Sequence, residues 1–217
     1  DANDASFDAN VGIGNYVFDG VASGIDAEKN VAVGHNSMSG VLTDTAHDNT
    51  AVGTNSLLTL TSGDSNVAYG SLAGTLITAG ERNVCIGSYS GDGFDTECDN
   101  TFVGNAAGGG SIAMAGAGQI SRLVAIGSGS LAGAVTQPGT VAIGYSALEA
   151  LTSGAGNIAI GSEAAVAITT GSSNTVIGYQ AFDAADGDEN VNTVIGHSAM
   201  GAATHDSISS NVAVGRE

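Results

Sequence analysis

Hydrophobic and polar residues alternate in short blocks along the chain, and one five-residue block returns twelve times. A polar residue usually opens the block, two mostly β-branched residues flank a small one, and a glycine closes it, as in NVAVG at 30–34 and NIAIG at 157–161. The glycine-to-glycine spacing is 17 residues in six of the eleven intervals and 18 to 23 in the others. Alternation over a short stretch indicates a β-strand, and a fixed period indicates a repeat architecture.

A second apolar run follows the closing glycine, for example at 56–60, 147–151 and 164–168, and it ends on a turn signal such as TSGD at 61–64. One repeat therefore predicts strand, corner, strand and turn, which together make one coil of a solenoid. The expected fold class is all-β: a parallel β-solenoid, or β-roll, of about twelve coils of roughly 17 residues. Residues 1–217 are expected to form a single continuous array of such coils.

The alternation within a strand also predicts which side chains face inward. We expect the Val and Ile rows on both sides of the central residue to form the core, because stacked coils align them into continuous ladders. The central residue is usually Ala, and so small a side chain on the other face suggests close approach of another surface. Three rolls around one axis would bury that face. The closing glycine is expected at a sharp corner that excludes a Cβ atom.

Asparagine opens ten of the twelve blocks. In-register stacking would place these amides in one row, where each can satisfy turn backbone groups of its neighbours. We interpret them as a structural ladder formed by Asn30, Asn49, Asn66, Asn83, Asn100, Asn157, Asn174, Asn192 and Asn211.

One coil is longer than the rest, with a glycine-rich insertion at 105–122 that is expected to form a loop. Solenoids need polar caps at their ends, and neither end of this chain has an evident one. The sequence therefore predicts a segment of a longer fibre, or a subunit that stacks end to end.

Charge narrows the set of partners. The formal net charge is −18 with only four basic residues, so nucleic acid binding is excluded on electrostatic grounds. No run of about 20 apolar residues is present, so this segment is not expected to be embedded in a membrane.

The repeated Asn-(Val/Thr)-Ala-(Val/Ile)-Gly block over residues 10–215 resembles the head repeats of YadA-type trimeric autotransporter adhesins and the "NTAVG"-type arrays of phage tail fibres. The resemblance implies a left-handed parallel β-roll, a homotrimer, an extracellular location on a virion tail fibre or a cell surface, and attachment to a cell or matrix. Adhesin head repeats are shorter than 17 residues, so this period fits the fibre arrays better.

Candidate binding chemistry is sparse. The densest acidic group is Asp183, Asp186, Asp188 and Glu189, with Asp92, Asp95 and Asp99 next. Hard oxygen ligands of this kind suit calcium, which is the one cofactor to consider, and a solvated acidic loop is the alternative.

Tyr145 and Tyr179 lie two coils apart at the same position of the repeat, where exposed rings could stack on a sugar; the alternative is half-buried strand tyrosines. Cys85 and Cys98 lie in one coil and either form a disulfide or point apart. The position of His35 and His197 accepts many residue types, as a surface row does.

Three functions follow in order of preference. The first is a structural and adhesive segment of an extracellular trimeric fibre, with a cell-surface glycan or receptor as partner. The second is a homopolymeric extracellular filament made of this chain. The third is a polysaccharide-acting enzyme, which ranks last because the sequence contains no catalytic motif. The chain is therefore not expected to be an enzyme.

Overall fold

The computed structural model describes residues 9–22, 24–109, 121–185, 187, 189–201 and 208–216. It is all-β, with twelve parallel strands that form a β-solenoid of about 11 turns, and this confirms the predicted fold class. Each strand has three residues and lies immediately before a corner glycine. The strands are β1 (Val11–Ile13), β2 (Val31–Val33), β3 (Thr50–Val52), β4 (Val67–Tyr69), β5 (Val84–Ile86), β6 (Thr101–Val103), β7 (Val124–Ile126), β8 (Val141–Ile143), β9 (Ile158–Ile160), β10 (Thr175–Ile177), β11 (Thr193–Ile195) and β12 (Val212–Val214).

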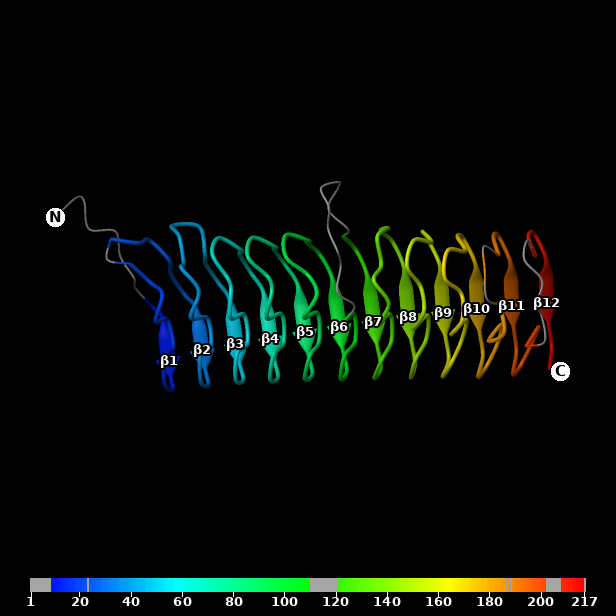
Figure 1. Cartoon of the computed structure of the whole chain (residues 1–217), viewed down its shortest axis with the longest axis horizontal. Coiled ribbons are helices and arrows are strands. Elements are labelled where there is room, and N and C mark those ends of the chain that lie inside the picture. The colour runs from blue at the N-terminus through cyan, green and yellow to red at the C-terminus, as the bar shows by residue number, and fades with distance from the viewer. Residues whose placement is uncertain are drawn as a thin grey trace. The chain divides into compact units, whose positions relative to one another are not determined.

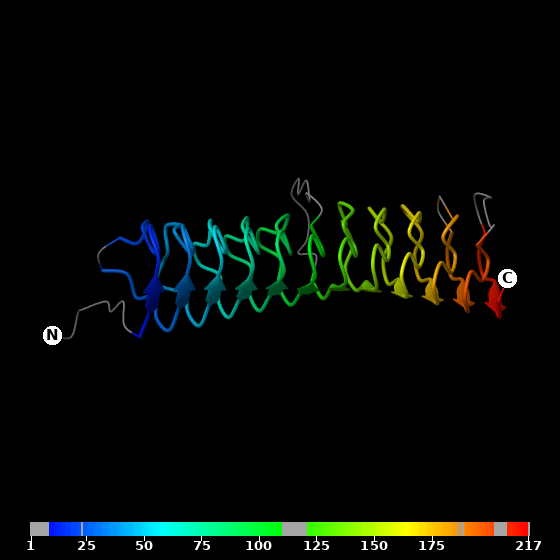
Figure 2. The ribbon, with the colours of Figure 1, turned by 90° about the horizontal axis from the view of Figure 1, so that it is seen from below.

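The chain divides into two compact units, Asp1–Asn100 with β1 to β5 and Thr101–Glu217 with β6 to β12. Within each unit the strands lie side by side in chain order (Figure 1), with most of each turn on one side of the strand row (Figure 2). The prediction of a single continuous array therefore stays a prediction. Residues 110–120, the middle of the predicted insertion, lie outside the described residues.

Neighbouring strands pair with no offset between equivalent positions. In the first unit Ala32 pairs with Ala51, and in the second Ala142 pairs with Ala159. Each position of the repeat therefore forms a row along the solenoid axis.

The prediction of which strand face is buried is wrong. The central residue of each strand from β2 to β11 is at most 1% exposed, whereas the Val, Ile and Thr residues beside it are half-buried or exposed. The physical reason lies in the turn segment, which brings large side chains such as Leu57, Leu60 and Leu148 into the interior. A thin interior that already holds these side chains has room for only a small residue on the strand.

Side-chain volumes across this interior are complementary. Phe102 occupies the central position of β6, and a Cβ atom at Gly108, the facing turn residue, would lie 2.5 Å from its Cδ1. In the coil of β1 the small residue is on the strand and the large one is in the turn: a Cβ atom at Gly12, the central residue of β1, would lie 3.2 Å from the ring of Phe18. In these two coils the large and the small residue thus exchange places across the interior, as close packing favours.

The predicted second strand is also absent at 56–60, 147–151 and 164–168, where the chain forms turns. Leu57, Leu148 and Ala165 have φ values of 45°, 51° and 52°, in the left-handed region, which breaks an extended strand. Backbone hydrogen bonds still join the coils here: Asn55 N donates to His35 O in the preceding coil, and Leu57 N donates to Ala73 O in the following one.

The corner glycines are required both by conformation and by space. Their φ values run from 129° to 145°, which residues with a Cβ atom rarely adopt. At Gly161 a Cβ atom would lie 2.2 Å from the carbonyl oxygen of Gly178 in the next coil.

We expect Gly161→Ala to lower the free energy of unfolding by about 3 kcal/mol or more, because the backbone strain and the clash must both be relieved by separating two coils. Gly139→Ala is the control, since Gly139 also has a positive φ of 79° but no heavy atom within 4 Å of its Cβ position. Chemical denaturation measures both. Equal losses in the two variants would contradict the stacking constraint.

Candidate functional site

The outward face of the strand row is apolar and uncharged. None of the twelve described strands contains a charged residue. The residues beside the buried central position present β-branched and aromatic side chains to the outside, and many are more than a third exposed. Away from the terminal strands β1 and β12 they include Val67, Tyr69, Ile86, Ile126, Ile158, Ile160, Ile177 and Ile195. An exposed apolar surface of this kind usually marks an interaction site.

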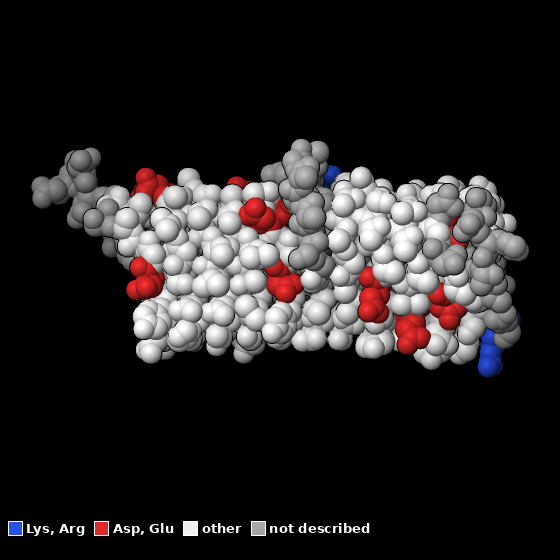
Figure 3. Space-filling model, viewed as in Figure 1, with Lys and Arg blue, Asp and Glu red and all other residues white. Residues whose placement is uncertain are grey.

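The charge of the chain lies outside the strands. Acidic side chains occur in the turns, and Figure 3 shows them singly or in small groups between uncharged areas of one face. Of the basic residues, Arg82 is held by ion pairs to Asp99 at 2.7 Å and to Glu81. These bonds raise the pKa of Arg82 and keep its charge engaged with the turn.

All five tyrosines of the chain lie within two residues of a corner glycine, and none is buried. Tyr69 precedes its glycine, Tyr145 and Tyr179 follow theirs, and Tyr16 and Tyr89 lie one residue further on. Tyr145 is 59% exposed and Tyr179 47% exposed, and both lie outside the strands, so the alternative of half-buried strand tyrosines is wrong.

The tyrosines of the second unit have polar neighbours. The rings of Tyr179 and His197 face each other at 5.1 Å between centroids with 35° between planes. Gln180 Nε2 donates a 2.7 Å hydrogen bond to Glu163 Oε2 in the preceding coil. We call Tyr145, Glu163, Tyr179, Gln180 and His197 the tyrosine patch. Sequence reasoning identified its two tyrosines but missed Glu163 and Gln180, whose signal is their place two residues after a corner glycine in adjacent coils.

The asparagine ladder predicted from the sequence is present as hydrogen bonds in both units. Asn66 donates from Nδ2 to Asn49 Oδ1 at 3.0 Å and to Gly80 O at 2.8 Å, and its own Oδ1 accepts from Asn83 N and Nδ2. The same bonds join Asn157, Asn174, Asn192 and Asn211 in the second unit. Each of these amides thus bonds backbone groups and its neighbours along the row, which is a structural role.

Two coils lack an asparagine at this position. Leu123 and Thr140 take its place, both fully buried, and the Thr140 hydroxyl oxygen has no hydrogen-bond partner among the described residues. The ladder is therefore interrupted within the second unit.

We expect Thr140→Asn to raise the free energy of unfolding by about 1 kcal/mol, because the introduced amide can accept from Asn157 and donate to the carbonyl of Gly154, the equivalent of Gly80. Thr140→Val is the control, since it removes the hydroxyl without adding an amide. Chemical denaturation of both variants tests the ladder, and a Thr140→Asn protein no more stable than Thr140→Val would contradict it.

The acidic groups proposed for calcium are only partly described. Asp186 and Asp188 lie outside the described residues; Asp183 is half-buried, and Glu189 is fully buried with Oε2 accepting from Gly187 N at 3.1 Å. No group of three or more His, Cys, Asp or Glu side chains suited to a metal is present in the described ranges. Calcium binding therefore stays a prediction.

Glu97 and Glu189 have a structural role that the sequence reading missed. In four of the six 17-residue coils this position is glycine. In the first of them, the turn N–H groups of Thr61, Ser62 and Gly63 all donate to the Thr78 carbonyl of the next coil. At Glu97 the carboxylate Oε2 accepts from Asp95 N and Thr96 N instead, at 2.7 and 3.0 Å. Each glutamate precedes a coil longer than 17 residues, which is the signal that could have identified it.

Of the two alternatives for Cys85 and Cys98, the structure has the second: the two cysteines point apart and form no disulfide. Cys85 occupies the central position of β5 and faces the interior, whereas Cys98 lies in the turn, where its Sγ accepts from Glu81 N at 3.3 Å. Burial raises the pKa of Cys85 to about 12, and the nearby Asp92 carboxylate adds to the shift. The Cys85 thiol is therefore unreactive at neutral pH.

Burial also raises the pKa of Asp92, whose Oδ1 has no hydrogen-bond partner among the described groups. Since the folded chain binds this proton more tightly than the unfolded one, the associated stability is present at low pH and lost as pH rises through the folded-state pKa.

Asp92→Asn should therefore be more stable than the wild type at pH 7, with the difference shrinking as pH falls toward the ordinary aspartate value of 3.8. Thermal melts across this pH range measure it, and Asp44→Asn, an exposed aspartate, is the control. A gain in stability that does not depend on pH would show that ionisation of Asp92 does not destabilise the folded chain.

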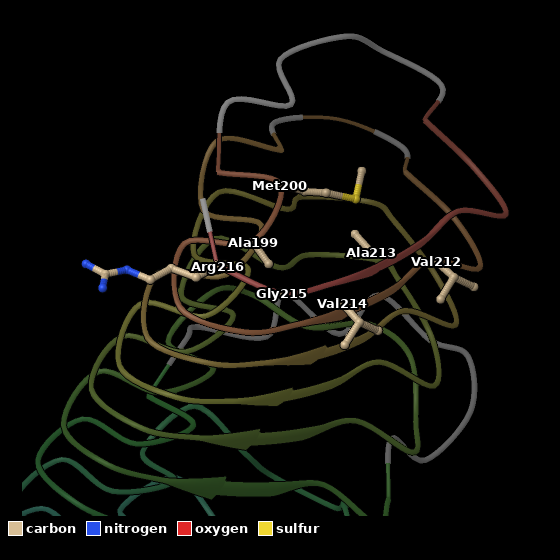
Figure 4. A pocket seen from close by; sticks show the side chains of 7 residues that line it. All are labelled: Ala199, Met200, Val212, Ala213, Val214, Gly215 and Arg216. Carbon is tan, nitrogen blue, oxygen red and sulfur yellow. The ribbon is translucent and has the colours of Figure 1, made fainter.

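A depression of about 390 Å³ lies over β12 (Figure 4). Its lining is aliphatic side chains and backbone, and Arg216, the one ionisable residue there, extends away from it (Figure 4). The lining holds no acid–base pair or nucleophile that could carry out a reaction.

Comparison of the chain with protein-family models, with curated proteins and with solved structures finds no match. In the described part of the chain no helix is long and apolar enough to cross a bilayer.

Proposed function

We propose that this chain is a structural and adhesive segment of an extracellular fibre, in which three copies pack side by side through the outward face of the strands. The observation that carries the proposal is the row of exposed, uncharged β-branched side chains along that face. It replaces the alanine face that the sequence suggested for this contact.

A second copy of the chain is the occupant that suits this face best. Each chain has a formal charge of −18, so copies repel one another wherever acidic turns meet. The strand face has no charge and is where they can approach. The side chains of this face also repeat from coil to coil at the strand spacing of about 4.8 Å. Only a surface with the same period can pack against each coil in the same way.

Mechanical properties favour the same role. Within each unit, the described coils are joined to their neighbours by strand hydrogen bonds, by turn hydrogen bonds and, in most coils, by the asparagine ladder. A chain bonded in this way resists bending and proteolysis, and repeated surface groups can add weak contacts into firm attachment.

The test is the mass in solution. We expect the wild type to have three times its 21.0 kDa chain mass by light scattering, and Ile160→Lys/Ile177→Lys to be a monomer with an unchanged circular dichroism spectrum. Ser173→Lys/Ser210→Lys adds the same charge at exposed turn positions, both equivalent to Lys29 in another coil, and should stay assembled.

A monomeric wild type, or assembly that survives the isoleucine substitutions, would overturn the packing proposal. Indefinite fibres in electron micrographs of the wild type would favour the filament alternative over a trimer.

A further inference from the structure

The tyrosine patch has an axial spacing that is set by the fold. Tyr145 and Tyr179 follow Gly144 and Gly178, whose coils are separated by one other coil, that of Gly161. Because β8, β9 and β10 pair without offset, the two positions lie in one row, about 10 Å apart along the axis from the strand spacing. Ser162 lies between them and His197 follows Tyr179 in the same row.

Polar groups lie beside the two rings. The hydrogen bond between Glu163 and Gln180 holds both side chains in place, yet it uses only one oxygen of the carboxylate and one N–H of the amide. His197 Nδ1 is within hydrogen-bond distance of the Ser198 hydroxyl at 3.0 Å, and its ring packs against that of Tyr179 in the preceding coil. The patch thus combines flat apolar faces with adjacent donors and acceptors.

We infer that this patch binds an extended, neutral β-1,4-linked polysaccharide that runs along the solenoid axis, a conclusion that rests on the adhesive function proposed above. Pyranose rings pack their C–H faces on aromatic rings, which have an apolar face and, in tyrosine, a polar edge. In an extended β-1,4-linked chain every second sugar presents the same face at a spacing close to two coils. Tyr145 and Tyr179 therefore stack on alternate sugars, and Glu163 and Gln180 bond hydroxyl groups between them.

Charge restricts the ligand to a neutral polymer. Glu149, Glu163 and Asp183 lie in the same three coils, with no basic side chain in that stretch of sequence, and the whole chain carries −18. An anionic polysaccharide would be repelled. The first unit offers a comparison, since Tyr69 and Tyr89 occupy different positions of their coils and form no row with two-coil spacing.

Titration calorimetry of the full chain with cellohexaose tests the inference. The wild type should bind; Tyr145→Ala and Tyr179→Ala should each weaken binding by about tenfold or more, and the double variant should show none. Tyr89→Ala, which removes a ring as exposed as that of Tyr179 and lying outside the strand face, is the matched control and should bind like the wild type. Cellobiose is too short to span both tyrosines and should bind at least tenfold more weakly than the hexamer.

Maltohexaose has the same sugars in a curved α-1,4-linked chain, so equal binding of it would overturn the spacing argument. Wild-type binding that the Tyr145 and Tyr179 variants leave unchanged, or an absence of binding to cellohexaose and chitohexaose alike, would overturn the site. The mass in solution separates failure of this inference from failure of the packing proposal. A trimer that binds no glycan refutes this inference alone, and a monomer that binds cellohexaose refutes the packing proposal alone.

Discussion

Stacking without offset is the constraint on which the rest of this structure depends. When one coil lies directly over the next, each buried amide of the asparagine row can bond its counterpart and a turn carbonyl together, as Asn66 does with Asn49 and Gly80. A shift of one residue would leave these groups buried and unpaired, at a cost of about 1–3 kcal/mol for each. The same stacking brings corner glycines so close that a Cβ atom cannot fit between them.

Glu97 and Glu189 show what happens where this stacking changes. Three turn N–H groups of a regular coil need an acceptor, which the next coil normally supplies through one carbonyl oxygen. In the coils of Glu97 and Glu189, each of which precedes a longer coil, the glutamate carboxylate takes that place from within its own coil. The substitution satisfies the turn locally, so a longer coil can follow without leaving buried donors unpaired.

The repeat, the strand positions, the corner glycines and the asparagine row could all be predicted, because each leaves a periodic mark in the sequence. The inward face of the strand could not, because alternation separates two faces without saying which is buried. That choice depends on Leu57, Leu60 and their equivalents, which fill the interior from a turn that was expected to be a strand. The exchange of volume between Phe102 and Gly108 was the signal for the correct assignment, since only residues that face each other need to compensate.

The candidate site was predictable to the extent that it follows the same period. Tyr145 and Tyr179 were identified because they share both a position in the repeat and a residue type, and Glu163 and Gln180 were missed because they share only the position. A stacked fold turns a position in the repeat into a fixed distance along the axis, so the choice of coil sets the spacing between surface groups. Such a surface would select ligands by their own period, and both proposed partners have one: copies of the chain for the apolar strand face, and a regularly linked polymer for the row of tyrosines.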